Sequence, residues 1–86
     1  MNLFRGRLQK PHMFYAYVIK SIDHDFYYKG HCEDLNERLT QHNSGMTDSI
    51  RPYIPFTLAY SEEFTTREEA ILKERNILNP LLIEDF

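Results

Sequence analysis

Residues 27–45, YYKGHCEDLNERLTQHNSG, carry a short aromatic strand directly into a helix, and this junction decides the fold. The letters YYKGH are typical of a strand. Asp34 is a suitable N-cap residue and Glu37 follows three positions later, which is the spacing of a capping box. Gly45 closes the segment, because glycine readily adopts the left-handed conformation that follows many helices. The segment therefore predicts a strand and then a helix that ends near Asn43.

Two further strands are predicted around this segment. Residues 13–21 (MFYAYVIKS) are aromatic and β-branched on both faces, as expected for a central strand that is covered on both sides. Residues 23–25 (DHD) predict a hairpin turn that leads into the strand of residues 26–31, because Asp and His tolerate backbone angles that glycine would otherwise take. Residues 46–55 contain two prolines and predict a loop or a short helical turn. Residues 56–64 (FTLAYSEEF) predict the third strand.

A second helix is predicted over residues 68–78 (EEAILKERNIL). Thr66 and Glu69 have the spacing of a second capping box, and Pro80 is expected to end the helix. The element order is then β-β-α-β-α. This order predicts a small three-stranded sheet flanked by helices, an α/β fold of the α+β type.

The length of 86 residues allows one domain with a modest core. We expect this domain over residues 13–79, with a flexible extension of residues 1–12 before it and a short tail of residues 80–86 after it. No apolar run is long enough to cross a membrane, and the N-terminus lacks the apolar core of a signal peptide. The lone Cys32 excludes an intrachain disulfide and fits the reducing cytoplasm, where we expect the protein.

The charge of the chain is unevenly placed. Residues 1–12 hold three basic side chains and no acidic one, so residues 13–86 carry seven basic against thirteen acidic side chains, a formal charge of −6. Tight sequence-independent binding to nucleic acid relies on Lys and Arg that neutralise phosphates. The overall charge therefore argues against such binding, and any anion site must be local.

Glu74 is the clearest anomaly of the predicted second helix. Its neighbours three and four positions away are all apolar: Ala70, Ile71, Ile77 and Leu78. An unpaired carboxylate on such a stripe is costly. Either Glu74 lies at the edge of the stripe and reaches solvent, or it is compensated by an Arg, by several hydrogen-bond donors or by a divalent metal.

Arg38 and His42 stand one helical turn apart and project from the same face of the first helix. They can be a solvent-facing Arg and a helix-end His, or parts of a site. Tyr17 and Tyr28 can come together across the predicted hairpin, although aromatic packing is the usual role of such tyrosines. Gly30 within a strand often marks the close approach of another group or a ligand, which favours a site here.

The ordered set of these residues resembles the GIY-YIG nuclease superfamily, in particular its small stand-alone bacterial members. Tyr15-Ala16-Tyr17 is similar to the first half-motif, with Tyr15 at the position of the motif's glycine. Tyr28-Lys29-Gly30 is similar to the second half-motif. Arg38 follows Gly30 by eight residues, like the family's catalytic arginine. The resemblance covers residues 13–78.

Three later features strengthen the resemblance. His42 lies in an LxxRLxxHNSG stretch that is typical of the stand-alone members, and Arg51-Pro52 begins a segment like their basic, proline-containing loop. Glu74 falls at the family's metal-binding glutamate. The C-terminus departs from the pattern, because it ends with the acidic residues Glu84 and Asp85 where relatives usually continue with lysines.

The resemblance implies metal-dependent hydrolysis of phosphodiester bonds. Glu74 would hold one divalent ion, Mg²⁺ or Mn²⁺, and Arg38 would bind the scissile phosphate. Tyr17 or Tyr28 would orient or deprotonate the attacking water, with a cation lowering the hydroxyl pKa, and His42 is a second candidate base or proton relay. The residues alone do not decide among these three.

The resemblance further implies a DNA substrate, and we expect branched or damaged structures. It also implies that Lys29, Gly30 and Arg51 are among the substrate-binding residues. Because the predicted domain is acidic, its affinity for DNA is expected to be weak unless a protein partner or a second copy adds contacts. The competing hypothesis is a binding or interaction module that kept this scaffold and lost useful turnover. A hydrolase of small phosphoesters is less favoured, since no carboxylate and His cluster provides a two-metal clamp.

Overall fold

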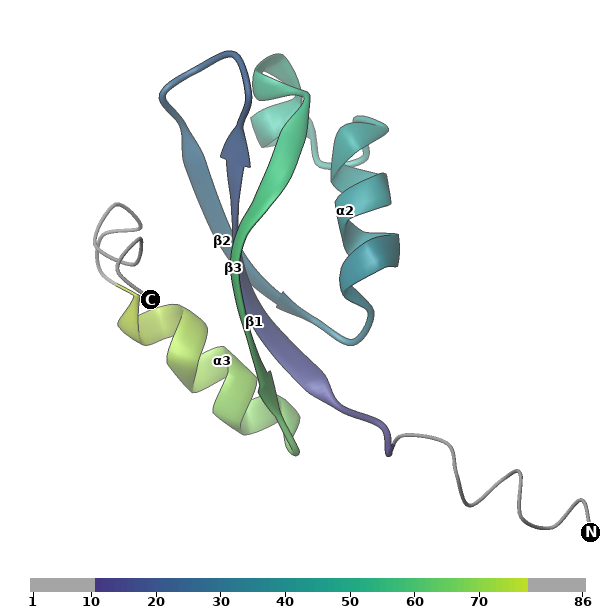
Figure 1. The fold of residues 1–86 in the computed structure, drawn as a ribbon, viewed down its shortest axis with the longest axis vertical. Coiled ribbons are helices and arrows are strands. Elements are labelled where there is room, and N and C mark those ends of the chain that lie inside the picture. Colours follow the sequence, from purple (N-terminus) through teal and green to yellow (C-terminus); the bar gives the residue numbers. More distant parts are fainter. Residues whose placement is uncertain (1–10, 78–86) are drawn as a thin grey trace, which may run out of the picture.

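Figure 1 shows the computed structural model, which describes residues 11–77 of the chain. The element order β-β-α-β-α is as predicted, and a 3₁₀ helix precedes the third strand. The expectations for residues 1–10 and 78–86, including the end of the helix at Pro80 and the acidic tail, lie outside the described residues. The elements are β1 (Phe14–Ser21), β2 (Tyr27–Cys32), α2 (Leu35–Asn43), η1 (Asp48–Tyr53), β3 (Phe56–Phe64) and α3 (Arg67–Asn76).

The sheet is antiparallel and has β1 at its centre, in the order β2-β1-β3. Tyr17 of β1 pairs with Gly30 of β2 on one side and with Ser61 of β3 on the other. The ladder between β1 and β3 is irregular between Val18 and Ile19. The central position of β1 explains its double-sided apolar sequence, because both of its faces are covered.

The two helices lie on opposite sides of the sheet (Figure 1). On the α2 side, Tyr17 and Ile19 are buried together with residues from β2, η1 and β3. On the α3 side, Ala16 and Val18 are fully buried, as is Ala70 of the helix. The core cluster on the α2 side contains Tyr17, Ile19, Cys32, Ile50 and Phe56, with Leu35 and Leu39 of α2 packed against it.

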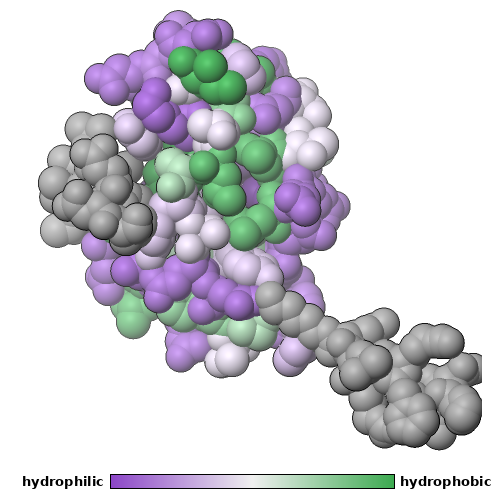
Figure 2. Space-filling model, viewed as in Figure 1, coloured by the Kyte–Doolittle hydropathy of each residue, from purple (hydrophilic) through white to green (hydrophobic). Residues whose placement is uncertain are grey.

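The α2 side is incompletely covered next to β3. Figure 2 shows apolar side chains gathered between β3 and α2, within a largely polar surface. Leu58 of β3 is 41% exposed there and lines a narrow apolar groove with Ile19, Leu35 and Leu39. The guanidinium-bearing side chain of Arg38 borders the same groove.

The helix ends follow the local signals of the sequence. Asp34 caps α2 by accepting a hydrogen bond from the N–H of Glu37 at 3.0 Å, but the described residues contain no return bond from Glu37, so only half of that predicted capping box forms. Gly45 follows the helix with a φ of 82°. Thr66 and Glu69 form both bonds of the second capping box. Local side-chain chemistry therefore positions the start of each helix.

Two predictions about local structure are wrong. α3 ends at Asn76 rather than Leu78, and the C-cap residue Ile77 is extended, with its carbonyl accepting a hydrogen bond from Lys29 Nζ at 2.7 Å. The hairpin turn has no residue with a positive φ. Its backbone is held by Ser21, whose hydroxyl accepts from the N–H of His24 at 3.1 Å, and this longer turn does not need left-handed residues.

Gly30 is the position where a side chain would most disturb the fold. A Cβ there would lie 2.6 Å from Tyr17 Oη and 2.7 Å from its Cζ. We predict that Gly30→Ala lowers the free energy of unfolding by about 1–3 kcal/mol, because the ring must leave its place. Chemical denaturation measures this change. In a Tyr17→Leu background, which has no ring over residue 30, the cost should nearly vanish; an equal cost in both backgrounds would contradict the prediction.

Candidate active site

A buried polar pair lies at the centre of the α2 side. Tyr17 Oη is 2.7 Å from Nε2 of His42, and the two side chains are only 3% and 2% exposed. The tyrosine ring passes over Gly30, whose missing side chain leaves room for it. Nδ1 of His42 lies 3.0 Å from Oγ1 of Thr47. Both imidazole nitrogens therefore have partners, and the sheet and α2 are joined through this pair.

Tyr28 lies on the other side of the same imidazole. It pairs with Ile19 in the sheet, which places it diagonally from Tyr17 on one face. Its ring meets that of His42 edge-on, with the centroids 5.3 Å apart, and it is half-buried. The structure thus brings together the three residues that the sequence proposed as candidate bases, with the difference that Tyr28 is the more accessible tyrosine.

The pair of Tyr17 and His42 is neutral at pH 7. Burial raises the pKa of the Tyr17 hydroxyl far above its ordinary value, and the opposing effect of the Arg38 guanidinium is smaller. Burial, and then the same guanidinium, lowers the pKa of His42. A protonated phenol next to a neutral imidazole favours an O–H of Tyr17 that donates to Nε2, with the Nδ1–H of His42 donating to Thr47. We expected a cation to lower the pKa of the tyrosine hydroxyl. The protein's own charges do not achieve this at Tyr17, because burial outweighs the effect of Arg38.

Arg38 lies at the mouth of a polar pocket of about 250 Å³ between α2 and the end of β2. Its side chain is exposed, and its guanidinium makes no hydrogen bond or ion pair with any residue in the range 11–77. This lack of a partner is unusual, because three carboxylates line the same pocket. The pocket is lined by His31, Cys32, Glu33, Asp34, Glu37, Arg38, Gln41 and Arg67.

Glu74 lies on the opposite side of the sheet and is compensated by a residue that the sequence did not single out. Its Oε1 is 2.7 Å from Nδ1 of His31, and its side chain is 27% exposed. Glu74 therefore reaches solvent in part, and its partner among the described residues is a His rather than the Arg or the several donors considered from the sequence. His31 follows Gly30 in β2, so its position on the face opposite to Gly30 and Tyr17 was available from strand alternation.

His31 connects the two sides of the sheet. It bonds Glu74 beneath β2 and also lines the pocket that contains Arg38. Glu74 and Arg38 therefore approach the same end of β2 from opposite faces. The carboxylate of Glu74 also contributes, as a minor effect, to the raised pKa of Tyr17, so its field reaches the buried pair.

The donor set around Glu74 fits a metal that keeps much of its water. Within residues 11–77, no three His, Cys, Asp or Glu side chains come together as a metal-binding cluster. Mg²⁺ commonly uses one or two carboxylates, several waters and substrate phosphates rather than a cage of protein ligands. A half-exposed carboxylate beside a pocket with a free guanidinium suits that pattern. The imidazole of His31 would also suit Mn²⁺.

Two other predicted binding residues are engaged elsewhere. Lys29 donates to the carbonyl of Ile77 and so fixes the end of α3. Arg51 donates to the carbonyl of Gly45 at 3.1 Å and pairs with Asp48. Neither lines the pocket of Arg38.

No helix within the described part of the chain has the length and apolar character that a membrane span requires.

Cys32 is a free and buried thiol within the described residues. Burial raises the pKa of this thiol, so it stays protonated.

Comparison with known proteins agrees with this arrangement. Residues 13–82 match the model of the GIY-YIG catalytic domain. A UPF0213 protein of Bacillus pumilus is 41% identical over 66 residues, which are 76% of this chain and 66% of that protein. A UPF0213 protein of Streptococcus pneumoniae is 38% identical over 64 residues, 73% of this chain and 64% of its own length.

An archaeal relative has a closer length. A UPF0213 protein of Halobacterium salinarum is 35% identical over 66 residues, covering 76% of this chain and 84% of its own. The chain thus spans slightly less than two thirds of the first two relatives. No solved structure matches it significantly. The names of these relatives state no activity. By its sequence match and by its sheet, helices and half-motifs, the chain belongs to the GIY-YIG family, a family of phosphodiesterases whose nucleases typically use a divalent metal.

Proposed function

We propose that this protein is a metal-dependent endonuclease that hydrolyses phosphodiester bonds in DNA, with branched or damaged DNA as the preferred substrate. The observation that carries the proposal is the guanidinium of Arg38, which has no partner among residues 11–77 although its pocket is rich in carboxylates. A cation beside Glu33, Asp34 and Glu37 would be expected to pair with one of them. A phosphate is the partner that its planar set of donors suits best.

Arg38 holds the scissile phosphate in this proposal. Its five N–H donors can follow the phosphate oxygens as negative charge grows on them, which stabilises the transition state more than the ground state. The exposed position of Arg38 on α2 lets a nucleic-acid backbone reach it. The rigid cap of Asp34 one turn earlier fixes the helix from which it projects.

Tyr17 and His42 provide a route for the proton of the attacking water. A water that donates to Tyr17 Oη can lose its proton to that oxygen while the phenolic proton moves to Nε2 of His42. The neutral imidazole is ready to accept it, and Thr47 holds the ring by its other nitrogen. Tyr28 contacts the same imidazole from the accessible side and orients the water or the substrate.

Glu74 is the proposed ligand of the divalent ion, with His31 holding its carboxylate. When bound, such an ion supplies a Lewis acid for the charge that develops on the phosphate and on the leaving 3′ oxygen. The bond to His31 keeps the Glu74 carboxylate directed toward the end of β2, where His31 also lines the pocket of Arg38.

A second candidate function is a binding module with little or no turnover. The observation in its favour is the acidic surround of Arg38, where three carboxylates would repel a phosphate backbone. The two functions differ in a single property, because only the nuclease loses a metal-dependent activity when Glu74 is changed.

We predict that the wild-type protein nicks supercoiled plasmid with Mg²⁺ or Mn²⁺, and that Arg38→Ala and Glu74→Gln each slow nicking by about 100-fold or more. Arg75→Ala removes an exposed positive charge from α3 and serves as the control, with unchanged nicking. Circular dichroism checks folding. If plasmid and cruciform and flap substrates all stay intact with folded wild-type protein, the binding module is the better function.

We predict that Tyr17→Phe and His42→Gln each slow nicking by about 100-fold, and that the double variant is no slower than either one, because both residues serve one proton route. Tyr28→Phe should have a smaller effect. Single-turnover rates at saturating DNA measure these changes. Full activity of Tyr17→Phe with loss of activity in Tyr28→Phe would assign the base to Tyr28 and contradict this route.

The neutral state of His42 has a consequence for stability. Its pKa in the folded protein lies below the ordinary value of 6.5, so between these two values the unfolded chain binds a proton that the folded protein does not. We predict that the free energy of unfolding falls as the pH drops below about 6.5. His42→Gln should reduce the slope of this free energy against pH by at most about 1.4 kcal/mol per pH unit. Urea unfolding at pH 7.5, 6.5 and 5.5 measures it; an unchanged slope in His42→Gln would be evidence against a neutral His42.

A further inference from the structure

The pocket of Arg38 contains a second arginine from a distant part of the chain. Arg67 is the first residue of α3, and it lines the same 250 Å³ pocket as Arg38 of α2. Its side chain is 47% exposed. Two guanidinium groups on different elements therefore face one hollow at the end of β2. Within the described residues, Arg38 has no ionic partner, whereas Arg67 has one.

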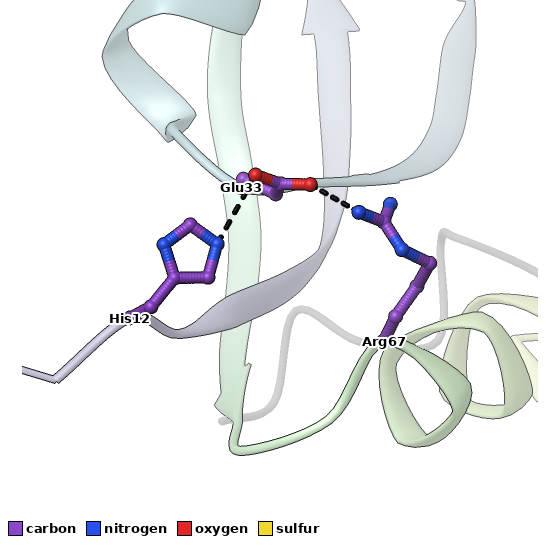
Figure 3. A network of polar contacts seen from close by, with 3 residues as sticks. All are labelled: His12, Glu33 and Arg67. Carbon is purple, nitrogen blue, oxygen red and sulfur yellow. Dashed lines mark hydrogen bonds and ion pairs between the residues drawn. The ribbon is translucent and has the colours of Figure 1, made fainter.

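The partner of Arg67 is Glu33, the residue that follows β2. Figure 3 shows the Glu33 carboxylate between two side chains, with one oxygen directed to Arg67 and the other to His12. His12 Nε2 lies 3.1 Å from Oε1. The bond with Arg67 holds the pKa of Glu33 below its ordinary value, so the carboxylate stays charged. A carboxylate thus occupies the donors that a phosphate would use.

The guanidinium of Arg67 is also held from a second direction. It lies over the ring of Phe14, 5.0 Å from the centroid, and Phe14 in turn meets His12 edge-on. This contact fixes the position of Arg67 independently of Glu33. If Glu33 turned away, Arg67 would stay at the pocket with free donors. The Glu33 side chain is 42% exposed, so it has room to turn toward solvent.

We propose that Arg38 and Arg67 form a two-point site for neighbouring phosphates of one DNA strand, and that Glu33 occupies Arg67 until a phosphate displaces it. This inference rests on the proposed nuclease function and adds to it a second phosphate contact and a competing internal anion. Exposed ion pairs contribute little net stability, so a phosphate can replace the carboxylate at small cost. The displaced Glu33 keeps its bond to His12.

The two-point site lets the carboxylates around Arg38 make the pocket selective among anions. An anion with a single charged group gains only Arg38 and still meets the field of Glu33 and its neighbours. A strand that presents two phosphates gains both guanidinium groups and moves Glu33 aside. The pocket thereby favours a polynucleotide over a free phosphate or a mononucleotide.

Binding of a fluorescein-labelled DNA flap substrate in EDTA, measured by anisotropy from 25 to 200 mM salt, tests the proposal without cleavage. Glu33→Gln should tighten binding at least threefold more than Glu37→Gln. Glu37→Gln is the matched control, because it removes the same charge from the same pocket and Glu37 has no ion pair within residues 11–77. Arg67→Gln should weaken binding and lower the slope of log K against log salt by about 0.9. Arg67→Lys, which keeps the charge, should be intermediate.

The double variant shows whether Glu33 acts through Arg67. In an Arg67→Gln background, Glu33→Gln should improve binding only as much as Glu37→Gln does in that background. Equal effects of Glu33→Gln and Glu37→Gln in the wild-type background would overturn the displacement of Glu33. An Arg67→Gln protein that binds like wild type would overturn the second phosphate contact.

Arg38→Gln separates this inference from the function on which it rests. If Arg38→Gln weakens binding and Arg67→Gln does not, the phosphate site at Arg38 stands and the two-point site is refuted. If wild-type protein does not bind, or if Arg38→Gln has no effect, the proposed function fails and the inference fails with it. Thermal melts of each variant confirm that the comparison is between folded proteins.

Discussion

The contact between Tyr17 and His42 is the constraint on which the rest of the structure depends. It links the central strand to α2 across the one position of β2 that has no side chain, Gly30. A buried hydroxyl and a buried imidazole would each be costly if unpaired. Here they are hydrogen-bonded to one another, and Thr47 is the partner of the second imidazole nitrogen. A protonated phenol in this contact favours the tautomer in which Nε2 of the imidazole accepts a proton. The packing of the core and the proposed chemistry therefore require the same geometry of Tyr17 and His42.

The sheet divides the proposed chemistry between its two faces. The phenol, the imidazole and Arg38 belong to the α2 side, and Glu74 belongs to the α3 side. They approach one another only at the edge formed by β2, where His31 bonds the carboxylate and lines the pocket. An edge strand explains this arrangement, because no further strand blocks access from either face. Tyr28, Gly30 and His31 of β2 therefore each touch a different part of the site.

Local signals in the sequence predicted the elements well, and long-range contacts account for what was missed. Asp34, Gly45 and the capping box of Thr66 act within a few residues, so the starts of both helices and the bounds of β3 follow from the chain alone. The end of α3 depends on Lys29, 48 residues away from Ile77, and the compensation of Glu74 depends on His31, 43 residues away. The spacing of residues along the chain does not indicate such long-range pairs. Strand pairing predicted that Tyr17 and Tyr28 lie together, whereas the contact of Tyr17 with His42, 25 residues away, is again a long-range pair.

The acidic character of the domain fits a phosphate site built on Arg38, which has no ionic partner among residues 11–77. Arg51 is paired with Asp48, and Arg67 with Glu33, so both lose much of their attraction for a passing polyanion. Arg38 keeps its full charge at the position where the proposed reaction takes place. The proposed function then implies a low and salt-sensitive affinity for ordinary duplex DNA, with binding that depends on how many phosphates reach the pocket together. A substrate whose backbone is bent or branched can present more of them at one point than a straight duplex can. The proposed preference for branched or damaged DNA therefore rests on the local charge pattern rather than on the net charge.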